Sequence, residues 1–252
     1  MQDLNKKNTK FIQLYKDTAE GKNTTPDSYK GLPIHAYKGL HGRVGELIAD
    51  YTAAEQSDAL DLAAGAGALS LRMKDMGASV TSVDIVEENF RLDKSQINFR
   101  CVDLNSSFSK LFEKRFDVIT AIEIVEHLEN TRAFIQNCQR LLKPGGVLFL
   151  STPNISSNQA IAELICKGTY PYFNEDYYGH GGHITMVPDW LFSLTLDDFD
   201  LEVTHKESYG IKPVIFSEWP MLYLTYNLVK LLRLKQKVLD GAINIYVIKS
   251  KK

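Results

Sequence analysis

Apolar and polar positions along residues 40–154 predict helices and short buried strands in turn. The segment "LHGRVGELIADY", residues 40–51, places its apolar residues at helical spacing. Beyond it, short apolar runs typical of buried strands alternate with helical patterns. Strands are expected at 58–64, 79–85, 97–104, 116–124 and 146–154, and the helices between them at 68–77, 87–94 and 131–146. This alternation predicts a doubly wound α/β fold with a mainly parallel sheet covered on both faces.

The C-terminal part of the chain breaks this rhythm. Residues 201–210, "LEVTHKESYG", and residues 241–250, "GAINIYVIKS", both have strand character. They complete a seven-stranded sheet whose last strand is expected to run antiparallel. The main domain is therefore residues 40–252, with helical lid insertions at about 155–190 and 211–240, and residues 1–39 form a polar N-terminal extension.

The composition is that of an ordinary globular protein. The 252 residues are 44 % hydrophobic and 24 % charged, with a formal net charge of −2, which gives no general attraction to nucleic acid. Three separate cysteines without a C-x-x-C pair argue against a disulfide framework or a thiolate zinc site. The N-terminus lacks the apolar core of a signal peptide, and no apolar run is long enough to span a membrane. A cytoplasmic protein is expected.

A glycine turn, "DLAAGAG" at 61–67, closes the first predicted strand. A dinucleotide site requires G-x-G-x-x-G, and the third glycine is missing here. Asp61 before the turn would repel a pyrophosphate but suits a cationic ligand such as a sulfonium with an α-amino group. Asp84 ends the second strand, where a carboxylate accepts the hydroxyls of a ribose, and Asp103 ends the third, where it suits an adenine amino group. A nicotinamide-dependent oxidoreductase is thus disfavoured.

Five segments in order, "DLAAGAG", "VTSVDI", "CVDL", "FDVITAIEIVEHL" and "LLKPGGVLFLSTPN", together resemble the Rossmann-like S-adenosylmethionine-dependent methyltransferases. The family usually has a glycine where this chain has Ala63. By this resemblance the cofactor contacts are Asp61, Ala63, Gly65, Gly67, Asp84, Ile85, Asp103, Leu104 and Glu123. Arg43 or His41, before the first strand, is expected to meet the cofactor carboxylate.

A run of ionisable residues, "EIVEH" at 123–127, follows the fourth strand. Glu123, Glu126 and His127 can converge at a strand-to-helix turn. His127 alone would serve as a base, whereas two carboxylates with an imidazole suit Mg²⁺ or Mn²⁺. The later run "YYGHGGH" adds His180 and His183, in a glycine-rich loop before a helix expected to start near Pro188.

The pattern of "EIVEHL", "STPN" and the later histidine resembles two methyltransferase groups. One comprises the O-methyltransferases of ubiquinone biosynthesis, and the other the metal-dependent 2′-O-methyltransferases of small RNAs. The resemblance implies that the metal ligands are Glu123, Glu126, His127 and His183, with Glu126, His127 and His183 catalytic. Because the chain has no basic face, a small phenol, catechol or sugar hydroxyl is the preferred acceptor, with RNA as the alternative. A non-catalytic binding module is a third alternative, disfavoured by the complete cofactor set.

Aromatic residues are frequent in both predicted insertions, from Tyr170 to Tyr178 and again at Trp219 and Tyr223. They are expected either to form a lid around an aromatic acceptor or simply to pack the lid helices. The amphipathic stretch 215–235 has two further interpretations, a peripheral membrane contact or a homodimer face.

Overall fold

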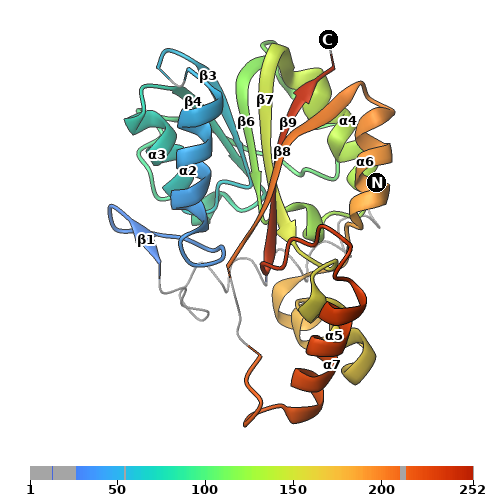
Figure 1. Ribbon diagram of the computed structural model, residues 1–252. Helices are drawn as coiled ribbons and strands as arrows, with labels where there is room; N and C mark the ends of the chain where they lie inside the picture. Colours follow the sequence, from blue (N-terminus) through green and yellow to red (C-terminus); the bar gives the residue numbers. More distant parts are fainter. Residues whose placement is uncertain (1–12, 14–26, 54, 211–213, 252) are drawn as a thin grey trace, which may run out of the picture.

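The computed structural model describes residues 13, 27–53, 55–210 and 214–251 of the chain. Most of the predicted N-terminal extension, residues 1–12 and 14–26, lies outside the described residues. The described part is a central sheet with helices on either side and a helical arm below it (Figure 1).

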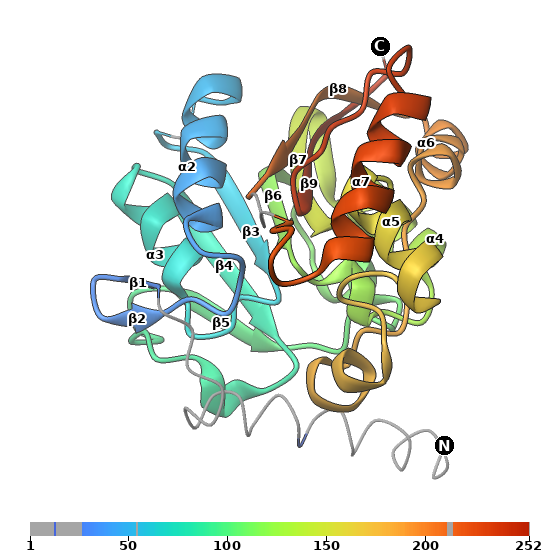
Figure 2. The same ribbon diagram turned by 60° about the horizontal axis from the view of Figure 1, so that its bottom comes forward.

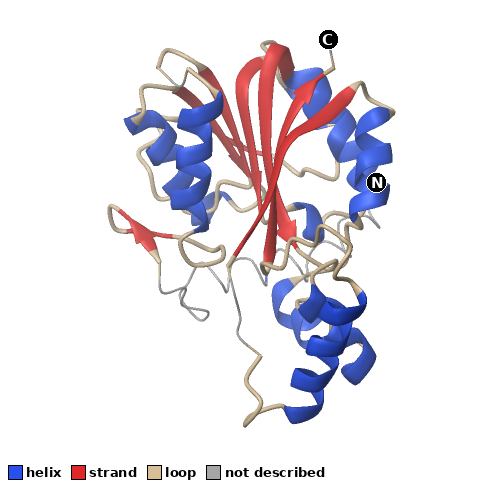
Figure 3. Cartoon of the chain, viewed as in Figure 1, coloured by secondary structure: helices blue, strands red, loops and turns tan. Residues whose placement is uncertain are grey.

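The sheet has seven strands in the order β5-β4-β3-β6-β7-β9-β8, and Figure 3 shows it in red between the helices. The strands are β3 (Asp58–Leu62), β4 (Ser79–Asp84), β5 (Asn98–Cys101), β6 (Phe116–Ile122), β7 (Leu142–Pro153), β8 (Leu201–Tyr209) and β9 (Ile243–Ser250). The neighbours from β5 to β7 are parallel, and β9 is antiparallel to both β7 and β8. The predicted fold class, including the antiparallel last strand, is confirmed.

Two layers of helices cover the sheet because strand side chains alternate between its faces. On one face Ala59 packs with helices α2 (Leu40–Tyr51) and α3 (Ala68–Asp75). On the other face Leu60 packs with α4 (Thr131–Leu141) and α6 (Asp189–Asp197). The remaining helices, α5 (Asn158–Lys167) and α7 (Pro220–Leu232), form the arm, and none of the described helices is long and apolar enough to cross a membrane.

The helix expected at 87–94 is wrong. Only a 3-10 turn, η1 (Glu87–Asn89), forms there, and the chain continues without regular structure to β5. Phe90 stacks on Phe99 with ring centroids 4.4 Å apart, and Leu92 lies directly over Gly67. Phe90 and Leu92 therefore cover the glycine turn. To reach it, their segment adopts an irregular backbone rather than a helix.

The carboxyl edge of the parallel strands is built from short turns and from the arm. Figure 2 brings this edge forward. The elements there are η2 (Phe108–Leu111), η3 (Val125–His127) and the π-helical turn η4 (Tyr177–Gly181), and a small hairpin of β1 (Ser28–Tyr29) and β2 (Leu32–Pro33) lies beyond α3.

Candidate active site

A cavity of about 540 Å³ opens at the carboxyl edge of the sheet. The ends of β3, β4, β5 and β6 supply one wall, and the loop from Tyr172 to Ile184 supplies another. In doubly wound sheets this edge is where ligands bind. Of the sequence-predicted cofactor residues, the lining includes Ala63, Gly65, Asp84, Ile85, Asp103, Leu104 and Glu123.

The glycine turn after β3 is held by Asp84. The amide of Gly65 donates to Asp84 Oδ2 at 2.8 Å, and the amide of Val86 donates to Oδ1 at 2.9 Å. Ala63, Gly65 and Gly67 all have positive φ, at 60°, 53° and 91°. A non-glycine residue at Ala63 is thus accommodated, although it carries the strain that the family's usual glycine would avoid.

Asp61 lies behind the turn rather than on the cavity wall. It is buried, and its carboxylate accepts hydrogen bonds from Ser70 Oγ at 2.5 Å and Thr120 Oγ1 at 2.7 Å. Burial raises the pKa of Asp61 to about 6. Asp61 therefore anchors α3 and β6 to β3. Gly67 is also absent from the lining, because Phe90 and Leu92 cover it.

Glu123 follows β6 with a φ of 53°, a strained conformation for a residue with a side chain. Ser151 on β7 holds it from two sides, since Ser151 Oγ accepts from the Glu123 amide and donates to Glu123 Oε1, both at 3.0 Å. Burial raises the pKa of Glu123 to about 7. Glu123 thus presents a largely desolvated carboxyl group to the cavity.

Glu126 is fully buried at the bottom of the site. Thr152 Oγ1 donates to its Oε2 at 3.2 Å, while no described residue hydrogen-bonds to Oε1. Burial, reinforced by the nearby charge of Glu123, raises the pKa of Glu126 well above its ordinary value. Its backbone oxygen accepts from the amides of Ile184 and Thr185, both at 2.9 Å, so Glu126 also fixes the histidine loop.

The imidazoles of His127 and His183 lie next to each other beside Glu126. His127 Nδ1 donates to the Gly182 carbonyl at 3.2 Å, and His183 Nδ1 donates to the Tyr172 carbonyl at 2.8 Å. One ligand atom each from Glu126, His127 and His183 lie within 4.8 Å of one another. Burial, assisted by the nearby His183, lowers the pKa of His127 to about 3. Burial also lowers the pKa of His183. Both rings are therefore neutral near neutral pH.

Glu123, the fourth predicted metal ligand, and His180, the other histidine of the loop, lie apart from this group. Glu123 lines the cavity but does not belong to the group of three that could share an ion. His180 also lines the cavity, but it is exposed and its Nδ1 contacts the carbonyl of Asp176 at 3.2 Å. Of the two histidines in the glycine-rich loop, the structure therefore brings only His183 to Glu126 and His127.

Neither Arg43 nor His41, which were expected to meet the cofactor carboxylate, lines the cavity. Arg43 forms two hydrogen bonds to Glu207 on β8, at 2.7 and 2.9 Å, and another to Glu46. His41 does not line the cavity, and burial lowers its pKa to about 4.

Residues that sequence reasoning missed are His35 and Tyr37, which enter the cavity from the extension. The available signal was the apolar Ile34 beside them, which is buried and indicates that this part of the extension packs against the domain.

A family model described as "Methyltransferase domain" matches residues 37–206, more than half of the chain. The chain belongs to the S-adenosylmethionine-dependent methyltransferases. The methyl donor is therefore S-adenosylmethionine, and the alternative of a nicotinamide-dependent oxidoreductase finds no support.

Curated relatives of this methyltransferase are named ubiquinone biosynthesis O-methyltransferases. The protein from Coxiella burnetii is 35 % identical over 129 residues, which are 45 % of this chain and 54 % of that protein. The protein from Haemophilus ducreyi is 28 % identical over 195 residues, 70 % of this chain and 78 % of its own length. The chain thus spans about half the length of the first of these relatives.

The fold agrees with solved methyltransferases. Magnesium protoporphyrin IX methyltransferase from Synechocystis, with bound SAH, has a TM-score of 0.56 and 16 % identity, over 84 % of this chain and 82 % of that one. At this identity the likeness concerns the fold alone, and the acceptor has to be argued from the site.

Proposed function

We propose that this methyltransferase transfers the methyl group of S-adenosylmethionine to a hydroxyl of a small molecule, with Glu126, His127 and His183 at the reacting end of the cavity. The observation that carries the proposal is the convergence of these three side chains within 4.8 Å. They belong to the same cavity as the glycine turn and Asp84, where the resemblance places the cofactor.

A divalent cation fits the three side chains. Glu126 Oε1 is a buried oxygen to which no described residue hydrogen-bonds, and leaving such an atom unsatisfied is costly. In both imidazoles Nδ1 is the donor, which leaves the lone pair on Nε2, the tautomer that binds metals. One carboxylate and two imidazoles with open positions suit a borderline divalent ion such as Mn²⁺ better than Mg²⁺, because Mg²⁺ prefers oxygen ligands.

Such an ion would acidify the accepting hydroxyl and hold it in line with the methyl group. The protein backbone positions the side chains that would bind the ion. The Glu126 backbone oxygen fixes the loop of His183, and the carbonyls of Gly182 and Tyr172 orient the two rings. Glu123 lines the same cavity and is held there by Ser151.

The walls of the cavity favour a small, uncharged or cationic acceptor over RNA. Among the described residues that line it there is no lysine or arginine, whereas its carboxyl groups are Asp84, Asp103, Glu123, Glu126 and Glu129. RNA binding relies on cations that neutralise phosphates. Tyr172 and Tyr177, with ring centroids 5.3 Å apart, provide an aromatic wall that suits a phenol or catechol. The relatives are named as O-methyltransferases, which agrees with an oxygen acceptor.

The test is methyl transfer from labelled S-adenosylmethionine to a panel of catechols, monophenols, sugars and short RNAs. We expect O-methylated catechols or phenols, loss of turnover in excess chelator and recovery with Mg²⁺ or Mn²⁺. Label found only on RNA 2′-hydroxyls, or only on nitrogen or carbon, would contradict the proposal. Full turnover on catechols in excess chelator would support methyl transfer to catechols but contradict the role of a metal ion.

A further inference from the structure

Helix α7 is apolar on two sides, and the described residues of the chain cover only one of them. On the covered side Leu222 and Val229 pack with Ala162 of α5. On the other side Met221, Leu224, Leu228 and Leu231 are 70, 56, 54 and 61 % exposed. A helix with apolar residues all round is normally buried, so this second side, here called the α7 stripe, indicates a binding surface.

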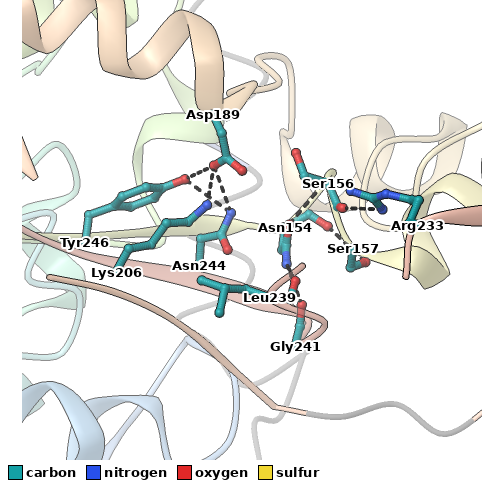
Figure 4. A network of polar contacts seen from close by, with 10 residues as sticks. All are labelled: Asn154, Ser156, Ser157, Asp189, Lys206, Arg233, Leu239, Gly241, Asn244 and Tyr246. Atoms are coloured by element: carbon teal, nitrogen blue, oxygen red, sulfur yellow. Dashed lines mark hydrogen bonds and ion pairs between the residues drawn. The ribbon is translucent and has the colours of Figure 1, made fainter. Parts of the chain in front are cut away.

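The arm that carries the α7 stripe is held firmly at its foot (Figure 4). Arg233 Nη1 donates to the carbonyl of Ser156 at 3.0 Å and to Asn158 Oδ1 at 3.1 Å. Asn154 Nδ2 donates to the carbonyls of Leu239 and Gly241 at 2.8 and 2.9 Å. These bonds join both ends of the segment after α7 to the start of α5, so the stripe is presented in a fixed orientation.

The charge of the arm differs from that of the chain. Residues 214–239 contain four cations, Lys230, Arg233, Lys235 and Lys237, and a single carboxylate, Glu218, in a protein whose formal net charge is −2. The cations lie at the C-terminal end of the α7 stripe. Phe216 and Trp219, 54 and 57 % exposed, lie at its N-terminal end. An apolar stripe bounded by aromatic rings and by lysines and arginines is typical of helices that lie in the interface of a bilayer.

We propose that the α7 stripe docks this protein on the surface of a bilayer that contains anionic lipids. The leucines would enter the boundary of the acyl chains, and the exposed Lys230, Lys235 and Lys237 would meet the headgroups. A second copy of the chain is less suitable as the occupant, because its own arm would bring four more cations and only one carboxylate. This inference does not depend on which acceptor is methylated.

The position of the arm gives the docking a consequence for the site. Figure 2 shows α5 and α7 at the edge of the sheet that also carries the loop around η4. That loop supplies Tyr177, His180 and His183 to the cavity wall. Docking through the α7 stripe would therefore bring this edge of the protein towards the membrane.

Vesicle flotation with the full chain tests the proposal. Vesicles of phosphatidylcholine containing about one third phosphatidylglycerol are expected to carry at least about tenfold more protein than vesicles of phosphatidylcholine alone. Leu224→Glu with Leu228→Glu should lower the bound fraction about tenfold or more, because charges enter the apolar boundary. Lys230→Glu with Lys235→Glu should lower it by a similar factor, since each basic residue near an anionic surface contributes about fivefold.

Matched variants separate docking from general effects. Leu194→Glu changes a leucine of α6 that is 55 % exposed, close to the 54 % of Leu228, and should leave flotation within about twofold. Lys38→Glu with Lys110→Glu makes the same change in net charge at two exposed lysines outside residues 214–239 and should also leave flotation unchanged. Circular dichroism and S-adenosylmethionine binding verify that every variant is folded.

Three results would overturn the proposal. The first is an absence of flotation with the anionic vesicles. The second is an equal loss in the Leu194→Glu control. The third is a dimer in vesicle-free solution that Leu228→Glu dissociates, together with no vesicle binding, which would assign the α7 stripe to a second copy.

Discussion

The imidazole of His183 stands edge-on to that of His127, with ring centroids 4.8 Å apart and ring planes at 86°. Each ring is oriented by a backbone carbonyl of the loop between Tyr172 and Gly182. The two rings and Glu126 thus form a group whose side chains the backbone already directs to one point.

Removal of one of the three proposed ligands should strongly weaken metal binding. We expect His183→Ala to weaken the binding of Mn²⁺ at least about a hundredfold, because loss of a direct ligand exceeds the ten- to hundredfold effects of residues behind the ligands. Titration calorimetry or electron paramagnetic resonance of Mn²⁺ with the S-adenosylmethionine complex measures it. His180→Ala is the control, since His180 lies in the same loop but outside the group of three. Equal affinity in wild type and His183→Ala would exclude the three-residue metal site.

The two glycines of the turn should respond differently to alanine. At Gly65 a Cβ would have only His35 Cδ2 near it, at 3.9 Å, so the cost of Gly65→Ala is the positive φ, about 1 kcal/mol of unfolding free energy. At Gly67 it would meet Leu92 Cδ1 at 2.7 Å and Phe90 Cε2 at 2.9 Å, so Gly67→Ala should cost about 2–3 kcal/mol.

Binding should show the opposite order. Because Gly65 lines the cavity and Gly67 does not, Gly65→Ala should lower the affinity for S-adenosylmethionine about tenfold or more, at a stability near that of wild type. Chemical denaturation and calorimetry measure the two effects. A Gly65→Ala variant with unchanged affinity would show that the cofactor does not approach this backbone.

The Arg43–Glu207 ion pair should make stability depend on pH. Hydrogen bonding to Arg43 holds the pKa of Glu207 below its ordinary value of 4.5. A carboxyl group whose pKa is lower in the folded state stabilises the fold above the unfolded pKa, and this contribution disappears as the pH falls through the folded pKa. We expect Glu207→Gln to lower the free energy of unfolding by about 1 kcal/mol at pH 7, because the pair is partly exposed.

The difference between wild type and Glu207→Gln should be constant above about pH 4.5 and shrink below it. Urea denaturation at a series of pH values measures this difference. A difference that grows on acidification would contradict the assignment.

Asp189 and Tyr246 should be coupled in a double-mutant cycle. Tyr246 OH donates to Asp189 Oδ1 at 2.5 Å, and Asp189 also pairs with Lys206 (Figure 4). Asp189→Ala leaves the buried hydroxyl without its acceptor and should cost about 2 kcal/mol of unfolding free energy, and Tyr246→Phe about 1 kcal/mol. The double variant should cost clearly less than the sum, and additive costs would show that the two side chains act independently.

The alternating pattern of apolar runs was sufficient for the sheet and most of its helices. Helix α2 begins at Leu40 and ends at Tyr51, as its apolar spacing predicts. Helix α4 ends at Leu141, five residues before the predicted end, because Pro144 cannot continue a helix and the chain already pairs with β6 from Leu142. The segment at 87–94 was mispredicted because local helical spacing there serves tertiary packing on Gly67.

The site was predicted from the sequence where residues follow strands, and less well where they do not. Strand ends locate Asp84, Asp103 and Glu123, because parallel strands align their carboxyl ends. Arg43 was misplaced because its partner Glu207 is distant in the sequence. The choice between His180 and His183 required the π-helical turn, which has no sequence signature of the kind that helices and strands have.

The neck of the arm has a consequence for how this protein can vary. Strand β8 ends and strand β9 begins at the same point, where Tyr209 pairs with Ile243 and the Ala242 amide donates to the Gly210 carbonyl at 2.8 Å. The chain therefore leaves the sheet and returns to it through a closed hairpin. The excursion between these residues can therefore change in length while β8 and β9 keep their register, provided that α7 still packs on α5.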